Sequence, residues 1–354
     1  MSIENILRKD IDRREFLKGT GKAAMGLAGL LSSCALAIKE TRQDVVDQKW
    51  DSNPIVPIPK EGCYIGGFRA HAKEGYEAFA RDIGKTPAWW DFSMGKFWAV
   101  DEFFPINQLH YLLSKGIFPE VKYGISNFKG YKEVAKGNHD AALKTVAGIA
   151  AEFGKPYVLI PFKEHNISAG IYWPHAGGSA GWFKDAWRHI HRIFQSEGAN
   201  ANTVWAINYL GTYTVAARSP LESFYPGDDV VDFIGFTSKN TIHLEGARSN
   251  FDNLFYSDYL WARNKHPTKP LCIFEIAQTH NKYQPQWIRK AYNDIKEKFP
   301  AIKMVQWWEC LLHINDKVED QYFSDNPESI KAMQEVHSDP YFIGGPLPFL
   351  DKYR

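Results

Sequence analysis

The sequence predicts a single (β/α)8 barrel, an α/β fold in which eight parallel strands close into a cylinder inside a ring of helices. From about residue 60, short apolar runs alternate with helical patterns, and there are eight such runs. Most of them are continuously apolar, as expected for parallel strands that are covered on both faces. Barrels of this type commonly use roughly 250 residues or more as one domain, so 354 residues accommodate one barrel. A doubly wound open sheet is the alternative that the same pattern allows.

The expected elements follow one another without an internal repeat or a second domain. The strands are expected at 63–66, 88–92, 118–123, 157–162, 203–207, 230–236, 271–274 and 304–308. Helical apolar stripes lie between or after them at 141–153, 186–195, 250–265, 286–299 and 327–337, and Asn138-His139-Asp140 offers a cap to the first of these helices.

Residues 1–34 are expected to be an export signal rather than part of the fold. Asp12-Arg13-Arg14-Glu15-Phe16-Leu17-Lys18 and the short apolar stretch 23–31 resemble a twin-arginine signal, and the stretch is too short to span a bilayer. Leu31-Ser32-Ser33-Cys34 resembles a lipobox, with Cys34 as the acylated residue. A cytoplasmic amphipathic helix that contains Arg-Arg is the alternative.

This interpretation divides the chain into a signal peptide (1–34), a flexible tether (35–59) and a barrel domain (60–354). It predicts a periplasmic or cell-surface protein that a lipid anchors to the membrane. The three remaining cysteines, Cys63, Cys272 and Cys310, are odd in number, and no disulfide is assigned.

Composition excludes some classes of function. The chain has 42 basic and 41 acidic residues and a net charge of +1, which argues against nucleic-acid binding. No histidine or cysteine spacing typical of a metal site is present, and no glycine-rich phosphate loop, so we expect no metal and no other cofactor. No protein partner is predicted. The aromatic content of 15% suits sugar binding, although aromatic residues also fill cores.

Two glutamates follow apolar runs at the positions where barrel enzymes carry their active residues, the C-terminal ends of strands. Glu164 comes after the fourth run and Glu275 after the seventh. These strands lie across the barrel mouth from one another, so the two side chains are expected to converge. A retaining glycosidase needs two carboxyl groups roughly 5 Å apart, one as acid/base and one as nucleophile. Each glutamate alone is equally consistent with a surface ion pair.

The segments around both glutamates resemble glycoside hydrolase family 26, the β-mannanase family. Ile160-Pro161-Phe162-Lys163-Glu164-His165-Asn166 is similar to that family's fourth strand, and Lys269-Pro270-Leu271-Cys272-Ile273-Phe274-Glu275 to its nucleophile strand. The segments 137–140, 201–205 and 225–235 resemble further parts of the family, and the likeness covers about residues 60–315. The resemblance implies that Glu164 is the acid/base and Glu275 the nucleophile. The segment 225–235 leads into a strand and is expected to serve the fold.

Two lysines depart from the family pattern. Lys163 stands where the family has His, and Lys239 where it usually has Tyr. A neighbouring ammonium group favours the ionised form of a carboxyl, which opposes general-acid catalysis. Three explanations are open: strand alternation turns Lys163 away from Glu164, the lysines bind an anionic sugar, or the site binds glycan without hydrolysing it.

Further residues near the expected strand ends are candidates for substrate binding. Trp307 and Trp308 end the eighth run, and alternation favours Trp308 as the one that faces the pocket. The others lie in the segments that follow the first, fourth and fifth runs: Arg69, His71, Asn166, Trp173, Tyr209 and Tyr213. Core packing or turn formation is the alternative for each.

The sequence therefore predicts a retaining endo-β-glycanase, with β-mannan as the first substrate to test. One alternative is a glycosidase that acts on an anionic exopolysaccharide. The other is a lipoprotein that binds glycans without cleaving them.

Overall fold

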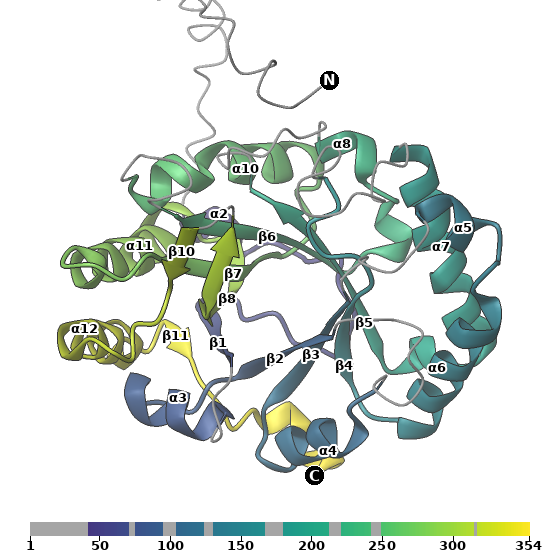
Figure 1. Ribbon diagram of the computed structural model, residues 1–354, viewed down its shortest axis with the longest axis horizontal. Coiled ribbons are helices and arrows are strands. Elements are labelled where there is room, and N and C mark those ends of the chain that lie inside the picture. The colour runs from purple at the N-terminus through teal and green to yellow at the C-terminus, as the bar shows by residue number, and fades with distance from the viewer. Residues whose placement is uncertain are drawn as a thin grey trace, which may run out of the picture. The chain divides into compact units, whose positions relative to one another are not determined.

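The computed structural model describes residues 42–70, 75–94, 104–123, 130–166, 180–211, 221–241, 249–314 and 317–354. Eight parallel strands form a closed barrel, in which β1 pairs with both β2 and β8 (Figure 1). The predicted (β/α)8 barrel is confirmed, and the β1–β8 pairing excludes an open doubly wound sheet. The strands are β1 (Cys63–Arg69), β2 (Trp89–Met94), β3 (Phe118–Tyr123), β4 (Tyr157–Ile160), β5 (Thr203–Leu210), β6 (Phe233–Asn240), β7 (Leu271–Gln278) and β8 (Ile302–Glu309).

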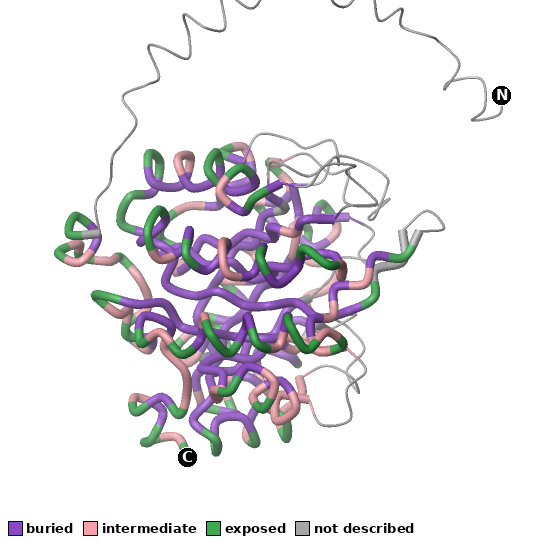
Figure 2. The backbone as a smooth tube through the Cα atoms, turned by 90° about the vertical axis from the view of Figure 1, so that its left-hand side faces the viewer, coloured by how far each residue is buried: buried purple, intermediate pink, exposed green. Residues whose placement is uncertain are grey.

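Helices surround the barrel, and Figure 2 shows the backbone of the strands buried while the helices alternate between buried and exposed turns. In α7, buried residues recur every three or four positions, so one stripe of the helix packs on the barrel. The helices are α3 (Gly75–Ile83), α4 (Ile106–Ser114), α5 (Tyr131–Ala135), α6 (Asp140–Phe153), α7 (Ala180–Ser196), α8 (Leu221–Phe224), α10 (Phe251–Lys265), α11 (Gln284–Lys298) and α12 (Pro327–Ser338), with 3-10 turns η3 (Ala199–Ala201), η4 (Asp228–Val230) and η5 (Pro348–Tyr353).

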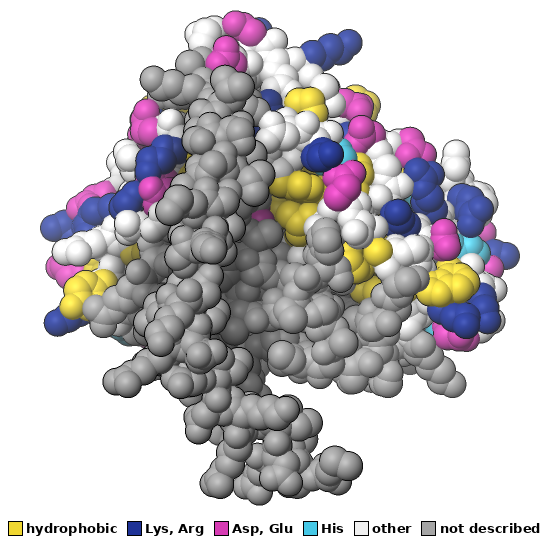
Figure 3. Space-filling view, turned by 90° about the horizontal axis from the view of Figure 1, so that it is seen from above, with side chains coloured by type: hydrophobic (Ala, Val, Ile, Leu, Met, Phe, Trp, Pro, Cys, Tyr) yellow, Lys and Arg dark blue, Asp and Glu magenta, His cyan; other side chains and the backbone are white. Residues whose placement is uncertain are grey.

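Three short strands add to this framework. β9 (Leu311–Ile314) and β10 (Lys317–Asp320) form an antiparallel hairpin directly after β8. β11 (Phe342–Ile343) runs parallel to the first residues of β1. Among the described residues, no helix is long and apolar enough to cross a membrane. On the face that Figure 3 shows, basic and acidic side chains are interspersed.

The structure corrects the expected tether. Residues 42–59 pack against the barrel: α2 (Arg42–Val46) carries the buried Val45, and Val56 is also buried in the core. Asn53 Nδ2 donates a hydrogen bond to the carbonyl of Thr203 (3.2 Å). The compact unit runs from Arg42 to Arg354, so the predicted domain boundary at residue 60 is too late. Burial of the two valines outweighs the proline-rich composition that suggested a free segment.

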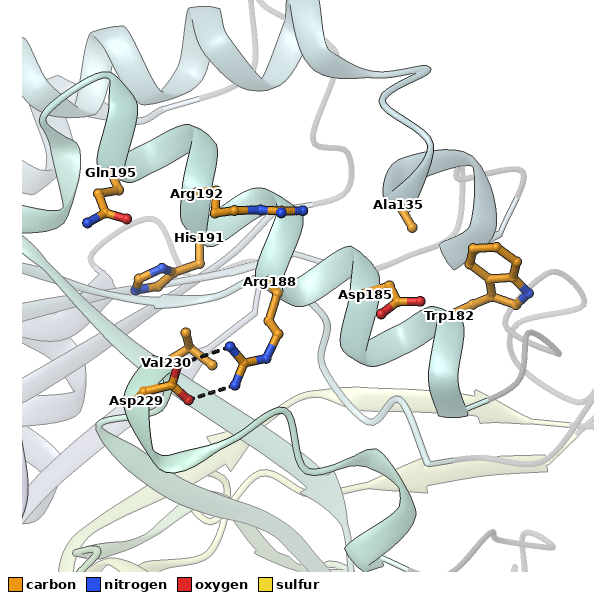
Figure 4. A pocket seen from close by; sticks show the side chains of 9 residues that line it. All are labelled: Ala135, Trp182, Asp185, Arg188, His191, Arg192, Gln195, Asp229 and Val230. Atoms are coloured by element: carbon orange, nitrogen blue, oxygen red, sulfur yellow. Dashed lines mark hydrogen bonds and ion pairs between the residues drawn. The ribbon is translucent and has the colours of Figure 1, made fainter.

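The segment 225–235 holds the N-terminal end of β6 in place, as expected from its sequence. Arg188 on α7 forms a two-pronged ion pair with Asp229 (2.6 and 3.0 Å) and donates from Nε to the carbonyl of Pro226 (2.8 Å). Lys269 Nζ donates to the carbonyl of Asp228 (2.8 Å). A pocket of about 550 Å³ lies over this region, between α7 and η4 (Figure 4). It is at the opposite end of β6 from the predicted site residues.

Candidate active site

Glu275 lies inside β7 rather than after it, at a β-bulge. Ile273 pairs with Phe236 and Glu275 with Thr237, so Phe274 is an extra residue in the ladder. A bulge changes the direction of the side chains that follow it. The Lys122 ammonium lies 5.7 Å from the centre of the Phe274 ring and 3.4 Å from Glu275 Oε1. Both consecutive side chains therefore face into the barrel, and Glu275 is only 1% exposed.

Gly235 makes room for the bulge. A Cβ at this position would come within 1.9 Å of the Phe274 ring, far inside van der Waals contact. We expect Gly235→Ala to displace Phe274 and with it Glu275, which lowers stability by about 1–3 kcal/mol through overpacking and reduces activity. Gly148→Ala on α6 is the matched control, because its Cβ meets nothing within 4 Å. Thermal unfolding and hydrolysis rates of the two variants check this, and equal behaviour would contradict the role of Gly235.

Three ammonium groups surround the carboxylate of Glu275. Lys239 Nζ on β6 donates a hydrogen bond to Oε2, while Lys122 Nζ on β3 lies 3.4 Å and Lys163 Nζ 3.9 Å from Oε1. Burial alone would raise the pKa of Glu275, but Lys239, Lys163 and Lys122 outweigh it and lower the pKa to about 2. At neutral pH Glu275 is therefore ionised, which is the state that a carboxylate nucleophile needs.

Lys122 belongs to a buried charge cluster that the sequence analysis missed. Its Nζ lies 2.8 Å from Asp91 Oδ2 and 3.1 Å from Glu120 Oε1, and it also donates to the carbonyl of Phe274 (3.1 Å). Burial would lower the pKa of Lys122, but Asp91, Glu120 and Glu275 outweigh it and raise the pKa. Burial raises the pKa of Asp91, against the effect of Lys122. The available signal was three charged residues inside otherwise apolar strand runs, at 91, 120 and 122.

Glu164 follows β4 and has an unusual backbone conformation. Its φ is +51°, and it is the one non-glycine residue with positive φ among the described parts of the chain. Its backbone N–H donates to the carbonyl of Asn208 on β5 (2.8 Å), and Lys163 forms an isolated bridge with the same residue. Non-glycine residues in this region cluster at functional sites. The ammonium of Lys239 interacts electrostatically with both Glu275 and Glu164, so both glutamates lie near this one ammonium group.

Trp308 borders the same charges. Its ring stacks on Phe68 of β1 (3.9 Å between centres, 14° between planes), and its indole N–H donates to Cys310 Sγ (2.6 Å). The ammonium groups of Lys239, Lys163 and Lys122 lie 4.5, 5.2 and 5.3 Å from the ring centre. The ring belongs to a residue that is 6% exposed, and it lies against Phe68 and all three lysines.

Two aromatic candidates point away from the barrel interior, and their expected role in substrate binding is wrong. Trp307 is fully buried and packs on Trp287 of α11 (6.2 Å). Tyr209 is also fully buried and packs on Trp261 of α10 (5.4 Å). Alternation along β8 and β5 turns these side chains toward the helices. Both belong to the core between strands and helices.

Arg69 is likewise a structural residue. It donates from Nε to Glu309 and lies 2.7 Å from Asp82 of α3, and its side chain is 7% exposed. Its guanidinium is thus committed to carboxylates on the neighbouring strand β8 and on α3. The expectation that it binds a sugar is wrong for this reason.

Asn166 and its neighbour His165 are buried below the surface of the site. His165 stacks on Phe183 of α7 (4.0 Å), and burial lowers its pKa to about 3, so its ring is neutral. Asn166 is wholly buried, so a contact with a sugar hydroxyl would require a movement of the segment. The candidates His71, Trp173 and Tyr213 lie outside the described residues, as does Cys34.

Candidate ligands for a metal do not converge in the described ranges, where no group of three or more His, Cys, Asp or Glu side chains could hold an ion. Cys63, Cys272 and Cys310 are buried and unpaired. The described residues supply this site with carboxylates, ammonium groups and an aromatic ring.

The fold is a (β/α)8 barrel with one carboxylate directly after β4 and one in the C-terminal half of β7, at the end of the barrel where enzymes of this fold carry their active residues. No family model matches the chain. Solved structures with the same fold include a modular endo-β-1,4-mannanase from Cellulomonas fimi (17% identity, TM-score 0.60, 80% of this chain and 72% of that one). A family 26 β-mannanase from Bacteroides ovatus is also similar (16%, TM-score 0.61, 82% and 93%). The resemblance to glycoside hydrolase family 26 is confirmed at the level of the fold.

Two curated relatives are described as β-1,3-xylanases. One, from a Vibrio species, is 24% identical over 223 residues, which are 61% of this chain and 43% of the relative. The other, from an Alcaligenes species, is 25% identical over 154 residues, 43% of this chain and 29% of the relative. The chain thus matches less than half the length of either xylanase. The two mannanases and two xylanases described above are all named as glycan-cleaving enzymes, but their named substrates differ.

Proposed function

We propose that the chain is a retaining endo-β-glycanase that uses Glu164 and Glu275. The observation that carries this proposal is that Lys239 interacts both with the buried carboxylate of Glu275 on β7 and with Glu164, which follows β4. The similarity to mannanases and xylanases supports the same class of reaction. β-Mannan is the first substrate to test, and β-1,3-xylan the second.

The reaction has two displacement steps. In the first, Glu164 donates its proton to the glycosidic oxygen as that bond breaks, and a carboxylate oxygen of Glu275 forms an ester with the anomeric carbon. In the second, Glu164 removes a proton from water, whose oxygen attacks the anomeric carbon and releases Glu275 as a carboxylate. Two inversions return the β configuration in the product.

A panel of glycans tests the proposal directly. The domain from residue 42 onward is incubated with β-1,4-mannan, β-1,3-xylan, β-1,4-glucan and acidic β-glycans, and new reducing ends are measured. We expect release from at least one polymer, with internal cleavage products and the β-anomer appearing first by NMR. Binding of glycans without any release of reducing ends would contradict the proposal, and the α-anomer as first product would contradict the retaining mechanism.

The pH dependence of the reaction follows from the lysines. Lys239 makes the largest contribution that lowers the pKa of Glu275, so Lys239→Met is expected to raise this pKa from about 2 toward its ordinary value. The acid limb of kcat/KM then moves to higher pH, because Glu275 must be ionised to attack. Lys144→Met, on the exposed face of α6, is the control. The test is to measure kcat/KM against pH over the range in which circular dichroism shows that each variant is folded. Acid limbs that coincide for the wild type and Lys239→Met would contradict the role of Lys239 in lowering the pKa of Glu275.

The same lowered pKa links Glu275 to stability. Its folded value of about 2 lies below the ordinary value of 4.5, so its ionisation stabilises the fold above about pH 4.5. This contribution is lost as the pH falls toward 2. The contribution of Glu275 ionisation to stability is constant near neutral pH. Changes of activity with pH in that range therefore do not arise from this contribution.

We further propose that the protein is exported by the twin-arginine route and anchored through a lipid on Cys34, as the motifs at 12–18 and 31–34 indicate. In this arrangement it acts on polysaccharide from the periplasm or the cell surface. Metabolic labelling with a fatty acid should mark the full chain but not Cys34→Ser. Equal labelling of the two would contradict the anchor.

A further inference from the structure

Among the partly exposed side chains around Glu275, positive charges outnumber negative ones. Lys163 and Lys239 are 19% and 10% exposed, and among the described residues Glu275 is the carboxylate within ion-pair distance of each. One carboxylate thus faces two partly exposed ammonium groups. Glu164 adds a negative charge near Lys239 only while it is ionised, and the first displacement step requires it to be protonated.

Lys122 does not contribute to this excess. Its ammonium is wholly buried, and it has two carboxylates of its own, Asp91 at 2.8 Å and Glu120 at 3.1 Å. The positive excess therefore belongs to Lys163, which follows the end of β4, and to Lys239, which lies on β6.

The excess persists as the reaction proceeds. When Glu275 forms an ester with the sugar, its negative charge disappears, while Glu164 has given up its proton and carries a negative charge near Lys239. Lys163 then has no carboxylate within ion-pair distance among the described residues. The transition states before and after the ester carry positive charge on the sugar, which ammonium groups at this distance repel. A neutral sugar offers no charge to offset this excess or this repulsion, and an ammonium group with little exposure and no counter-ion is costly.

We propose that the sugar bound at Glu275 carries an anionic group, a carboxylate or a sulfate, that pairs with Lys163 and Lys239. This inference rests on the proposed function and names its substrate class. The Trp308 ring lies 4.5 Å from Lys239 Nζ and 5.2 Å from Lys163 Nζ, so a sugar against this ring reaches both ammonium groups. An anionic substituent there offsets the positive excess before and after the ester forms.

Matched pairs of glycans test this proposal whichever sugar the site accepts. Each acidic polymer is compared with its own neutral partner of the same backbone: β-1,4-mannuronan and β-1,4-glucuronan with their carboxyl-reduced products, and sulfated with unsulfated β-1,3-xylan. We expect kcat/KM to be at least about tenfold higher on one acidic polymer than on its partner. Lys163→Met and Lys239→Met should each reduce this ratio severalfold, whereas Lys144→Met should not change it.

Binding separates this inference from the proposed function. Glu275→Gln removes the competing carboxylate and keeps both lysines, so it should bind the preferred acidic hexasaccharide severalfold more tightly than wild type, by calorimetry in low salt. If no glycan is cleaved but acidic hexasaccharides bind preferentially through the lysines, the proposed hydrolysis fails and the anionic site stands. If no acidic glycan exceeds its neutral partner in cleavage or binding, the anionic site is overturned, whatever the activity on neutral polymers.

Discussion

Glu275→Ala is expected to reduce the rate of hydrolysis on the order of 10⁴-fold or more, because it removes the atom that forms the covalent bond. This corresponds to about 5 kcal/mol of transition-state stabilisation. The loss should be in kcat, since the lysines and Trp308, which we propose contact the substrate, stay in place. Steady-state kinetics on the polymer identified by the glycan panel measure it, and calorimetry on the same variant tests whether binding is retained.

Two controls make the result specific. Glu275→Gln keeps the shape of the side chain and should be as inactive as the alanine variant, which excludes a simple cavity effect. Glu152→Ala removes an exposed carboxylate on α6 and should leave the rate unchanged. Full activity in either Glu275 variant would remove Glu275 from the mechanism.

Lys122→Met is expected to destabilise the fold by about 3–5 kcal/mol, since it leaves Asp91, Glu120 and Glu275 buried without their shared counter-ion. The midpoint of thermal unfolding should fall by roughly 6–15 °C. The variant should also lose activity, because Lys122 holds Glu275 Oε1 and the carbonyl of Phe274. Calorimetric or fluorescence melts check the first expectation, with Lys144→Met as the surface control.

A double variant separates the charge effect from lost packing. Asp91 lies closest to the Lys122 ammonium, at 2.8 Å, so Lys122→Met combined with Asp91→Asn removes one uncompensated charge. The double variant should be more stable than Lys122→Met alone, which gives a favourable coupling energy in the cycle. Additive losses from the two substitutions would show that packing, not charge, accounts for the cost.

The fold could be predicted from the sequence because each barrel strand corresponds to a local apolar pattern. Continuous apolar runs indicated all eight strands, and helices such as α6 and α12 begin and end within a residue or two of the expected positions. α7 begins at Ala180 rather than at 186, since the glycine-rich composition before it suggested a loop. Likewise the segment 42–59 was assigned to a tether by its prolines, while its burial depends on surfaces that come from distant parts of the chain.

The site was only partly predictable, because its geometry depends on which face of its strand each side chain occupies and on contacts between strands. Alternation correctly indicated that only one of Trp307 and Trp308 faces the charges, but the register of β5 that buries Tyr209 is set by pairing with its neighbours. The bulge that turns both Phe274 and Glu275 inward leaves no mark in a sequence pattern. The cluster of Asp91, Glu120, Lys122 and Glu275 joins strands β2, β3 and β7. The charges at 91, 120 and 122 interrupt apolar runs in the sequence, but their spacing does not show that they meet Glu275.

The central claim is that Glu275 forms the covalent bond to the sugar, and chemical trapping tests it most directly. A 2-deoxy-2-fluoro glycosyl fluoride of the sugar that the panel identifies slows release of the glycosyl-enzyme more than its formation. Digestion and mass spectrometry should then find the fluorosugar on the peptide that contains Glu275. Label on any other residue, or an enzyme that cleaves the glycan yet never acquires label, would contradict the account.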